Sequence, residues 1–137
     1  TWDQKYIYSI ELDKTDPEVY FISAPCGERR KRMAKAQVKA GVCGFETTVR
    51  TTKGEGYQVG IKIETDCPDI QELAVVLDEV NAFEQITFRE GVPEILALGY
   101  EHCSHASCPV PAAIIKAVEV EAGLALPEDV EIRLSKD

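Results

Sequence analysis

The side chains in this chain that are best suited to chemistry are those of its cysteines and histidines. There are five cysteines and two histidines, and both histidines fall within the stretch HCSHASC, residues 102–108. Cys67 and Cys108 each stand directly before a proline and a predicted helix. A helix N-terminus offers unpaired N–H groups and a positive dipole end, which favour a thiolate over a thiol. Because the thiolate is the form that ligates metals and attacks electrophiles, this placement predicts a thiol-rich functional site.

A predicted hairpin brings a third cysteine toward this site. The runs VKAGVCGFETTVRTT and YQVGIKIETDC alternate like strands around KGEG. With Glu55 at the loop centre, Val49 lies opposite Ile61, and both apolar faces coincide. The same register places Cys43 opposite Cys67, with Cβ atoms ~5 Å apart if pairing extends that far. The alternative is that these are two unrelated buried thiols, since free cysteine is common in protein cores.

Four thiolates, from Cys43, Cys67, Cys103 and Cys108, are the predicted ligand set. Such a set suits a 4Fe–4S cluster, a 2Fe–2S cluster or a tetrahedral zinc ion. The spacings match no ferredoxin run and no zinc ribbon, and C-x-x-C is absent. His102 and His105 flank Cys103. We expect each to donate a hydrogen bond to a ligating sulfur or to serve as a plain loop residue, and direct zinc ligation is the alternative.

Two readings of the same residues need no metal. In a thiol-dependent enzyme, Cys108 would be the nucleophile, His105 or His102 its base, and Glu101 the group that orients the histidine. In a dithiol redox protein, either Cys43 and Cys67 or Cys103 and Cys108 would form the pair. The fifth cysteine, Cys26, has no place in any of these sites.

The strand-like and helix-like patterns around these residues predict a single α+β domain over residues 33–137, with a mainly antiparallel sheet and two helices on one face. One helix lies within PDIQELAVVLDEVNAF and the other within VPAAIIKAVEVEA, and both show apolar residues at helical spacing. QITF is a candidate short strand, GVPEILALGY is ambiguous, and VEIRL is a predicted final strand. The buried helix positions are predicted to be Ile70, Leu73, Leu77 and Val80 in the first helix and Val110, Ile114, Ala117 and Val118 in the second, with Gly123 just past its end.

Residues 1–32 are predicted to be an N-terminal extension. KYIYSIEL and EVYFISA alternate like the strands of a hairpin, and a segment that is not native is the alternative. Met33 is the only methionine and is a candidate native start.

Charge and composition narrow the class of protein. The formal net charge is −9, and all of it falls within residues 33–137, which carry nine basic and eighteen acidic side chains. Such a surface disfavours nucleic acid and anionic membranes, and it suits a protein partner with a basic docking surface. No apolar run reaches the ~20 residues of a transmembrane helix, and no signal peptide is evident. The odd cysteine count then favours a reducing cytoplasm and metal-binding or redox thiols.

Three segments, AGVCGFETTV, TDCPDIQELA and EHCSHASCPVPAAIIKAVEVEAGLALPEDVEI, resemble a family of small uncharacterised proteins of anaerobic bacteria and archaea. The resemblance covers about residues 37–134. Its shared C-G-F, D-C and C-P-V-P segments correspond to Cys43, Cys67 and Cys108, whereas Cys103 lies in the variable approach to the last motif. The anaerobic setting implies oxygen-sensitive chemistry. The resemblance therefore favours a small iron–sulfur protein, with a 4Fe–4S cluster, in electron transfer or in cluster or metal delivery, ahead of a zinc-stabilised interaction module.

Overall fold

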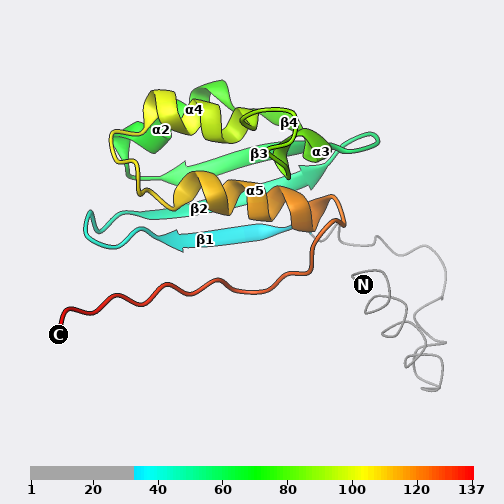
Figure 1. Cartoon of the computed structure of the whole chain (residues 1–137). Coiled ribbons are helices and arrows are strands. Elements are labelled where there is room, and N and C mark those ends of the chain that lie inside the picture. Colours follow the sequence, from blue (N-terminus) through cyan, green and yellow to red (C-terminus); the bar gives the residue numbers. More distant parts are fainter. Residues whose placement is uncertain (1–32) are drawn as a thin grey trace, which may run out of the picture. The chain divides into compact units, whose positions relative to one another are not determined.

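The structure is a computed structural model that describes residues 33–137, so the predicted N-terminal extension lies outside the described residues. The described chain forms an α+β domain, as the sequence predicts (Figure 1). No helix in residues 33–137 has the length and apolar character needed to cross a membrane. In chain order the elements are β1 (Lys35–Lys39), β2 (Glu46–Lys53), β3 (Gln58–Thr65), α2 (Pro68–Val76), β4 (Glu79–Asn81), α3 (Ala82–Gln85), α4 (Glu94–His102) and α5 (Val110–Glu121).

The four strands form one antiparallel sheet in the order β1-β2-β3-β4. The predicted β2–β3 hairpin is present, but its register is wrong by two residues, because Val49 pairs with Ile63 rather than Ile61. Gly56, with a φ of 58°, lies at the centre of the loop instead of Glu55. A two-residue shift leaves every side chain on its predicted face, so the core positions of the hairpin are unaffected.

The helices cover one face of this sheet and enclose the core between the two layers (Figure 1). The predicted stripe of α5 is confirmed, since all four of its residues are buried. Gly123 follows the C-cap of α5 with a φ of 77°, as expected of a glycine that ends a helix. The core side chains are those of Val49, Val59, Ile70, Leu73, Leu77, Val80, Ala82, Ile95, Val110, Ile114, Ala117, Val118 and Ala122.

The structure differs from the prediction in four places. The first helix ends at Val76, and Val80 is buried from the short strand β4 instead of from the helix. The stretch QITF forms no strand, because its glutamine is the last residue of α3. The stretch GVPEILALGY, which is ambiguous in the sequence, forms most of α4. The described residues therefore contain four helices rather than two. Residues 126–137 form neither helix nor strand, which contradicts the predicted final strand.

Polar contacts from distant residues hold the ends of α4 and α5. The buried Gln85 accepts a hydrogen bond from the Ile95 N–H at 3.1 Å and so caps α4, where the N-cap residue is a proline without a capping side chain. The Glu121 carboxylate, in the last turn of α5, accepts from the backbone N–H groups of Ala34 at 2.6 Å and Lys53 at 2.9 Å. These contacts fix one end of each helix against the rest of the domain.

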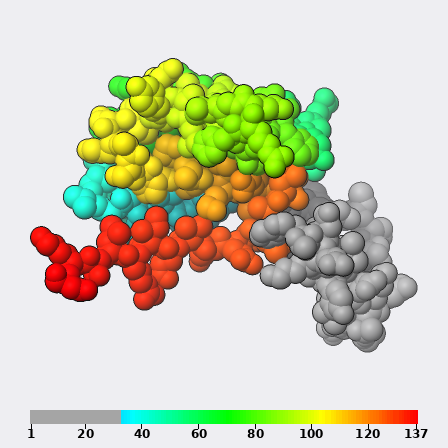
Figure 2. All heavy atoms as spheres, viewed as in Figure 1, coloured from blue at the N-terminus to red at the C-terminus, as the bar shows by residue number. Residues whose placement is uncertain are grey.

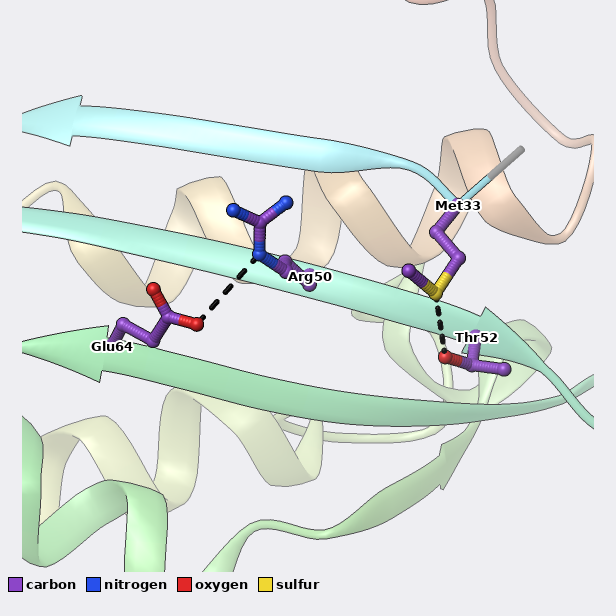
Figure 3. A network of polar contacts seen from close by, with 4 residues as sticks. All are labelled: Met33, Arg50, Thr52 and Glu64. Carbon is purple, nitrogen blue, oxygen red and sulfur yellow. Dashed lines mark hydrogen bonds and ion pairs between the residues drawn. The ribbon is translucent and has the colours of Figure 1, made fainter. Parts of the chain in front are cut away.

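The sheet face that the helices leave open is polar. Arg50 Nε lies 3.7 Å from Glu64 Oε1, and the Thr52 hydroxyl donates to the Met33 sulfur at 3.4 Å (Figure 3). Exposed pairs of this kind contribute little to stability. Charge is nevertheless unevenly distributed. Residues 33–65 hold five basic and three acidic side chains, whereas residues 66–137 hold four basic and fifteen acidic side chains. The region of β1 to β3 is therefore slightly basic and the remainder strongly acidic.

Helices α4 and α5 approach closely at a glycine. A Cβ atom placed on Gly99 would lie 2.8 Å from Cγ and 3.1 Å from Cβ of Pro111. Pro111 is buried and its ring is rigid, so it could not move aside. The hydrogen side chain of Gly99 is therefore what allows the two helices to pack at this distance.

We predict that Gly99→Ala destabilises the protein. Overpacking costs ~1–3 kcal/mol, and the better helix propensity of alanine offsets at most ~1 kcal/mol of that. The measurement is the free energy of unfolding in urea. Gly60→Ala is the matched control, because its Cβ would meet its nearest neighbour, the Thr52 carbonyl oxygen, at an ordinary 3.6 Å. Equal stability of the two variants would contradict this account of the helix contact.

Candidate functional site: a thiol cluster at one end of the sheet

Three cysteines lie where helices begin or end. Cys67 is the N-cap of α2, with Pro68 as the first helical residue, as the sequence predicts. Cys103 is the C-cap of α4, and Cys108 lies two residues before α5. In Figure 1 the start of α2 and the connection from α4 to α5 lie at the same end of the sheet. We call Cys67, Cys103 and Cys108 the thiol cluster.

The members of the thiol cluster influence one another electrostatically. The pKa of Cys103 is raised to about 11, first by burial and then by the neighbouring charges of Cys108 and Asp69. A side-chain hydrogen bond with Cys108 and the charge of Cys67 raise this pKa further. All three thiols are half-buried and none is in a disulfide. The structure therefore places two of the predicted ligands, Cys67 and Cys108, within electrostatic range of a third, Cys103.

A carboxylate ties the loop between α4 and α5 to α2. Asp69 Oδ2 accepts a hydrogen bond from the Ser104 N–H at 2.8 Å. This bond and the Ser104 side chain lower the pKa of Asp69, and the nearby charge of His105 lowers it further. Because Ser104 follows Cys103 and Asp69 lies two residues after Cys67, the contact holds two cluster cysteines near each other.

Two threonines attach Cys67 to the end of the sheet. The Thr65 hydroxyl accepts from the Cys67 N–H at 3.1 Å and shares a hydrogen bond of 2.9 Å with the Thr47 hydroxyl. Thr47 and Thr65 are also cross-strand partners in β2 and β3. The first residue of the cluster is thus anchored to a regular part of the sheet. The roles of Asp69, Ser104 and Thr65 were not part of the sequence prediction, although each lies within two residues of a cluster cysteine.

Cys43 is not paired with Cys67 across the hairpin, so this prediction is wrong. It lies in the turn between β1 and β2, closed by a hydrogen bond from the Gly44 N–H to the Gly41 carbonyl at 2.9 Å, and it is exposed. Both glycines have positive φ, 94° and 74°, as a tight turn requires. The turn precedes β2 at Glu46, one residue before the Thr47–Thr65 pair. Cys43 therefore occupies the same end of the sheet as the cluster, on an exposed turn.

The two histidines lie on either side of Cys103. His102 Nδ1 is 3.8 Å from Glu72 Oε2, which links α4 to α2. The carbonyl of His105 accepts from the Cys108 N–H at 3.1 Å, and its imidazole lies near enough to Asp69 to affect that carboxyl. These contacts run to carboxylates and backbone, so the proposed hydrogen bonds from the histidines to sulfur stay a prediction.

The described residues do not form a ready-made site for one metal ion. Within residues 33–137, no group of three or more His, Cys, Asp or Glu side chains is placed to hold a metal as it stands. Binding would require the side chains of the thiol cluster to draw together and Cys43 to join from its turn. The four-thiolate ligand set therefore stays a prediction.

A protein-family model described as a family of unknown function (DUF6951) matches residues 34–134. The chain belongs to this family. The match spans the whole sheet, the helices, the thiol cluster, Cys43 and the extended residues up to Leu134. Neither the curated proteins nor the solved structures include a match to this chain. The family is uncharacterised, in agreement with the resemblance seen in the sequence, while a defining cysteine motif and an anaerobic range stay predictions.

We predict that Cys103 is a slowly reacting thiol in the reduced, metal-free protein. At pH 8 a pKa of about 11, against 9.0 for an ordinary thiol, leaves ~100-fold less thiolate. Alkylation by iodoacetamide, followed by peptide mass spectrometry, should label exposed Cys43 at least ~10 times faster than Cys103.

The same experiment with Cys108→Ser supplies the control. This variant removes a charge and a hydrogen bond that raise the pKa of Cys103, so alkylation of Cys103 should accelerate. If Cys103 reacted faster than Cys43 in the unsubstituted protein, the electrostatic description of the cluster would be wrong.

We predict that the link between Asp69 and Ser104 persists well into the acid range. The pKa of Asp69 is lowered, so its ionised form and the hydrogen bond are fully present above the ordinary value of 3.8 and are lost only as the pH falls through the lower, folded value. The Ser104 amide shift, followed by NMR against pH, should therefore titrate with a midpoint below 3.8. Asp69→Asn should abolish this transition, and a midpoint at or above 3.8 would contradict the assignment.

Proposed function

We propose that the thiol cluster, completed by Cys43, holds a thiolate-ligated iron–sulfur cluster, and that the protein acts in electron transfer or in cluster or metal delivery. The observation that supports this proposal is the placement of Cys67 at the start of α2 near Cys103 and Cys108 in the connection between α4 and α5. This placement favours metal binding, because thiolates that lie close together repel one another and a bound cation neutralises their charge.

The helix geometry supports ligation by Cys67 in particular. As the N-cap of α2 it lies beside the backbone N–H groups of the first turn, which could donate to a ligating sulfur. Cys108 approaches α5 in a similar way, two residues before its first turn. Backbone N–H groups near ligating sulfurs are among the features that tune the potential of an iron–sulfur cluster.

Within residues 33–137 no group of side chains is placed to hold one metal ion, which favours a cluster over a single zinc ion. A tetrahedral zinc ion with Zn–S bonds of ~2.3 Å requires its sulfurs to be ~3.8 Å apart. A 4Fe–4S cluster distributes its four thiolates over four iron atoms and accepts a wider set. Here three donors are half-buried and the fourth, Cys43, is on an exposed turn. A zinc-stabilised interaction module is the alternative, and the iron, sulfide and zinc content of the purified protein distinguishes it from a cluster protein.

The surroundings of the site suit a basic protein partner. Asp66 precedes Cys67, Asp69 and Glu72 follow it on α2, and Glu101 lies two residues before Cys103. Glu72 is well exposed, although it pairs with His102. A partner with lysines and arginines around its own redox or metal site would be attracted to this end of the domain, and its association rate would fall with added salt.

A dithiol redox function is the second candidate, favoured by the nearness of Cys103 and Cys108, which raises the pKa of Cys103. In that reaction the two thiols would form one S–S bond and release two protons and two electrons. A disulfide such as oxidised glutathione would accept them and become two thiols. A cluster and a disulfide compete for the same sulfurs, so the two functions predict different products on purification without oxygen.

The first test is purification of the full chain under anaerobic conditions, followed by visible spectroscopy and analysis of iron, sulfide and zinc. We expect broad absorption near ~400 nm with iron and sulfide in equal amounts. Cys67→Ser and Cys108→Ser should each lose most of the iron, and Cys43→Ser should lose it if the turn supplies the fourth ligand. Cys26→Ser is the matched control and should retain the full iron content.

The alternative outcomes assign the other functions. About one zinc per chain without iron would contradict the cluster and support the zinc-stabilised module. Absence of metal after anaerobic purification and after reconstitution with iron and sulfide would contradict both. A loss of two protein thiols on addition of oxidised glutathione, without bound glutathione and with an intramolecular disulfide that Cys103→Ser does not form, would then establish the dithiol pair.

A further inference from the structure

The C-terminal residues carry a strand pattern without a strand partner among the described residues. Leu124 still packs against the core, but every residue from 127 to 137 is exposed. Val130, Ile132 and Leu134 are 60%, 73% and 91% exposed, and they alternate with charged residues. Figure 1 and Figure 2 show this segment as an extended tail that leaves the end of α5.

The tail already has the side-chain arrangement of a strand. The side chains of Glu131 and Arg133, two residues apart, form an ion pair on one side of the chain. Alternation places the three apolar side chains on the opposite side. An exposed apolar row of this kind is unfavourable in water and indicates a surface that binds something.

Strand β1 offers an edge that could accept such a segment. It is the outermost strand on its side of the sheet, so its outward N–H and C=O groups have no strand partner in the described residues. Ala36 and Val38 point toward the core side, where they are only partly buried, and Lys35 and Lys39 are exposed on the polar side. The edge thus combines a small apolar row with two exposed lysines, of which Lys39 has its Nζ 3.8 Å from Oε1 of Glu46 in β2.

The two sequences match in one antiparallel register. With Ile132 opposite Val38, Leu134 falls opposite Ala36, and the apolar rows coincide on the side of the helices. In the same register Glu131 faces Lys39, which pairs opposite charges on the polar side. Lys35 then faces Ser135, so no like charges are brought together. Registers shifted by two residues place Arg133 opposite Lys35 or opposite Lys39, which brings like charges together.

The direction of the tail favours a second copy over the chain's own edge. The end of α5 is fastened beside the start of β1 by the hydrogen bond between Ala34 and Glu121. In Figure 1 the tail then runs in the same direction as β1. Pairing within one chain would therefore be parallel, whereas a second molecule can approach in the antiparallel orientation used throughout this sheet, which is slightly more stable per residue.

We propose that two copies of this chain form a two-fold dimer in which Val130–Leu134 of each copy adds to the outer edge of β1 of the other. The exchange is reciprocal, so it closes as a dimer rather than growing into a fibre. The family model extends to Leu134, so the segment belongs to the part of the chain that matches the family. This proposal does not depend on the thiol cluster or on any metal.

The test is the dimer dissociation constant of the full chain, measured by sedimentation equilibrium under reducing conditions. Ile132→Glu should weaken the dimer at least ~10-fold, because it places a charge in the apolar row opposite Val38. Arg133→Glu is the matched control: the same side chain is introduced one position away, on the polar side, and the dimer should persist. Circular dichroism confirms that each variant is folded.

A charge exchange tests the register. Lys39→Glu should weaken the dimer by about fivefold, since it faces Glu131, and Lys39→Glu combined with Glu131→Lys should restore it. A full chain that is monomeric at all accessible concentrations would overturn the proposal. A dimer that Ile132→Glu leaves intact would overturn the role of the tail, and failure of the charge exchange to restore dimerisation would overturn the register.

Discussion

The close contact between Gly99 and Pro111 is the constraint on which the arrangement of the thiol cluster depends. Cys103 lies one helical turn beyond Gly99, and its N–H donates to the Gly99 carbonyl at 2.9 Å. Cys108 lies three residues before Pro111. When α4 and α5 touch at this pair, the end of one helix and the approach to the other are held close together, and both thiols follow. The cluster is thus a consequence of helix packing more than of the loop that joins the helices.

The remaining contacts hold this arrangement in place from both sides. Gln85 and Glu121 secure the ends of α4 and α5 that lie away from the cluster. At the cluster itself, Asp69 holds Ser104, and Thr65 holds Cys67. Side chains that sit at the ends of packed helices and strands are positioned more firmly than side chains on free loops. Cys43 is the exception, because it lies on an exposed turn.

The amino-acid pattern predicted those features that depend on local periodicity and capping. The buried stripe of α5, the ends marked by Pro68 and Gly123, and the faces of the β2–β3 hairpin all follow from side-chain spacing. Register is different, because alternation determines which face a residue occupies but not which partner it meets. The loop is centred on Gly56, which has a positive φ, and not on Glu55. This difference of one residue shifts the register by two residues, so Cys43 does not lie opposite Cys67.

Contacts between elements far apart in the sequence were harder to predict. The stretch that forms α4 contains a glycine, which is unfavourable in a helix, and only Pro111 explains why it is needed. Asp69 and Ser104 are polar residues of common type, and nothing in their spacing indicates that they meet. The final strand was predicted from correct periodicity, but a strand also needs an edge to pair with. The alternation of Val130, Ile132 and Leu134 is therefore suited to strand pairing, but these residues have no strand partner within the described chain.

The edge strand β1 leads directly into the turn that carries Cys43. Lys39 is the last residue of β1, and the turn begins directly after it. In the proposed register, Glu131 of the second copy lies opposite Lys39, and Val130 lies opposite Ala40. Pairing would then extend along the base of the turn and reduce the freedom of Cys43, whereas Cys67, Cys103 and Cys108 are held by contacts within one chain. In the proposed ligand set three donors are fixed and one lies on a turn bordered by another molecule, so its affinity for a cluster would depend on association. Dimerisation would thus influence the completion of the site without contributing a ligand to it.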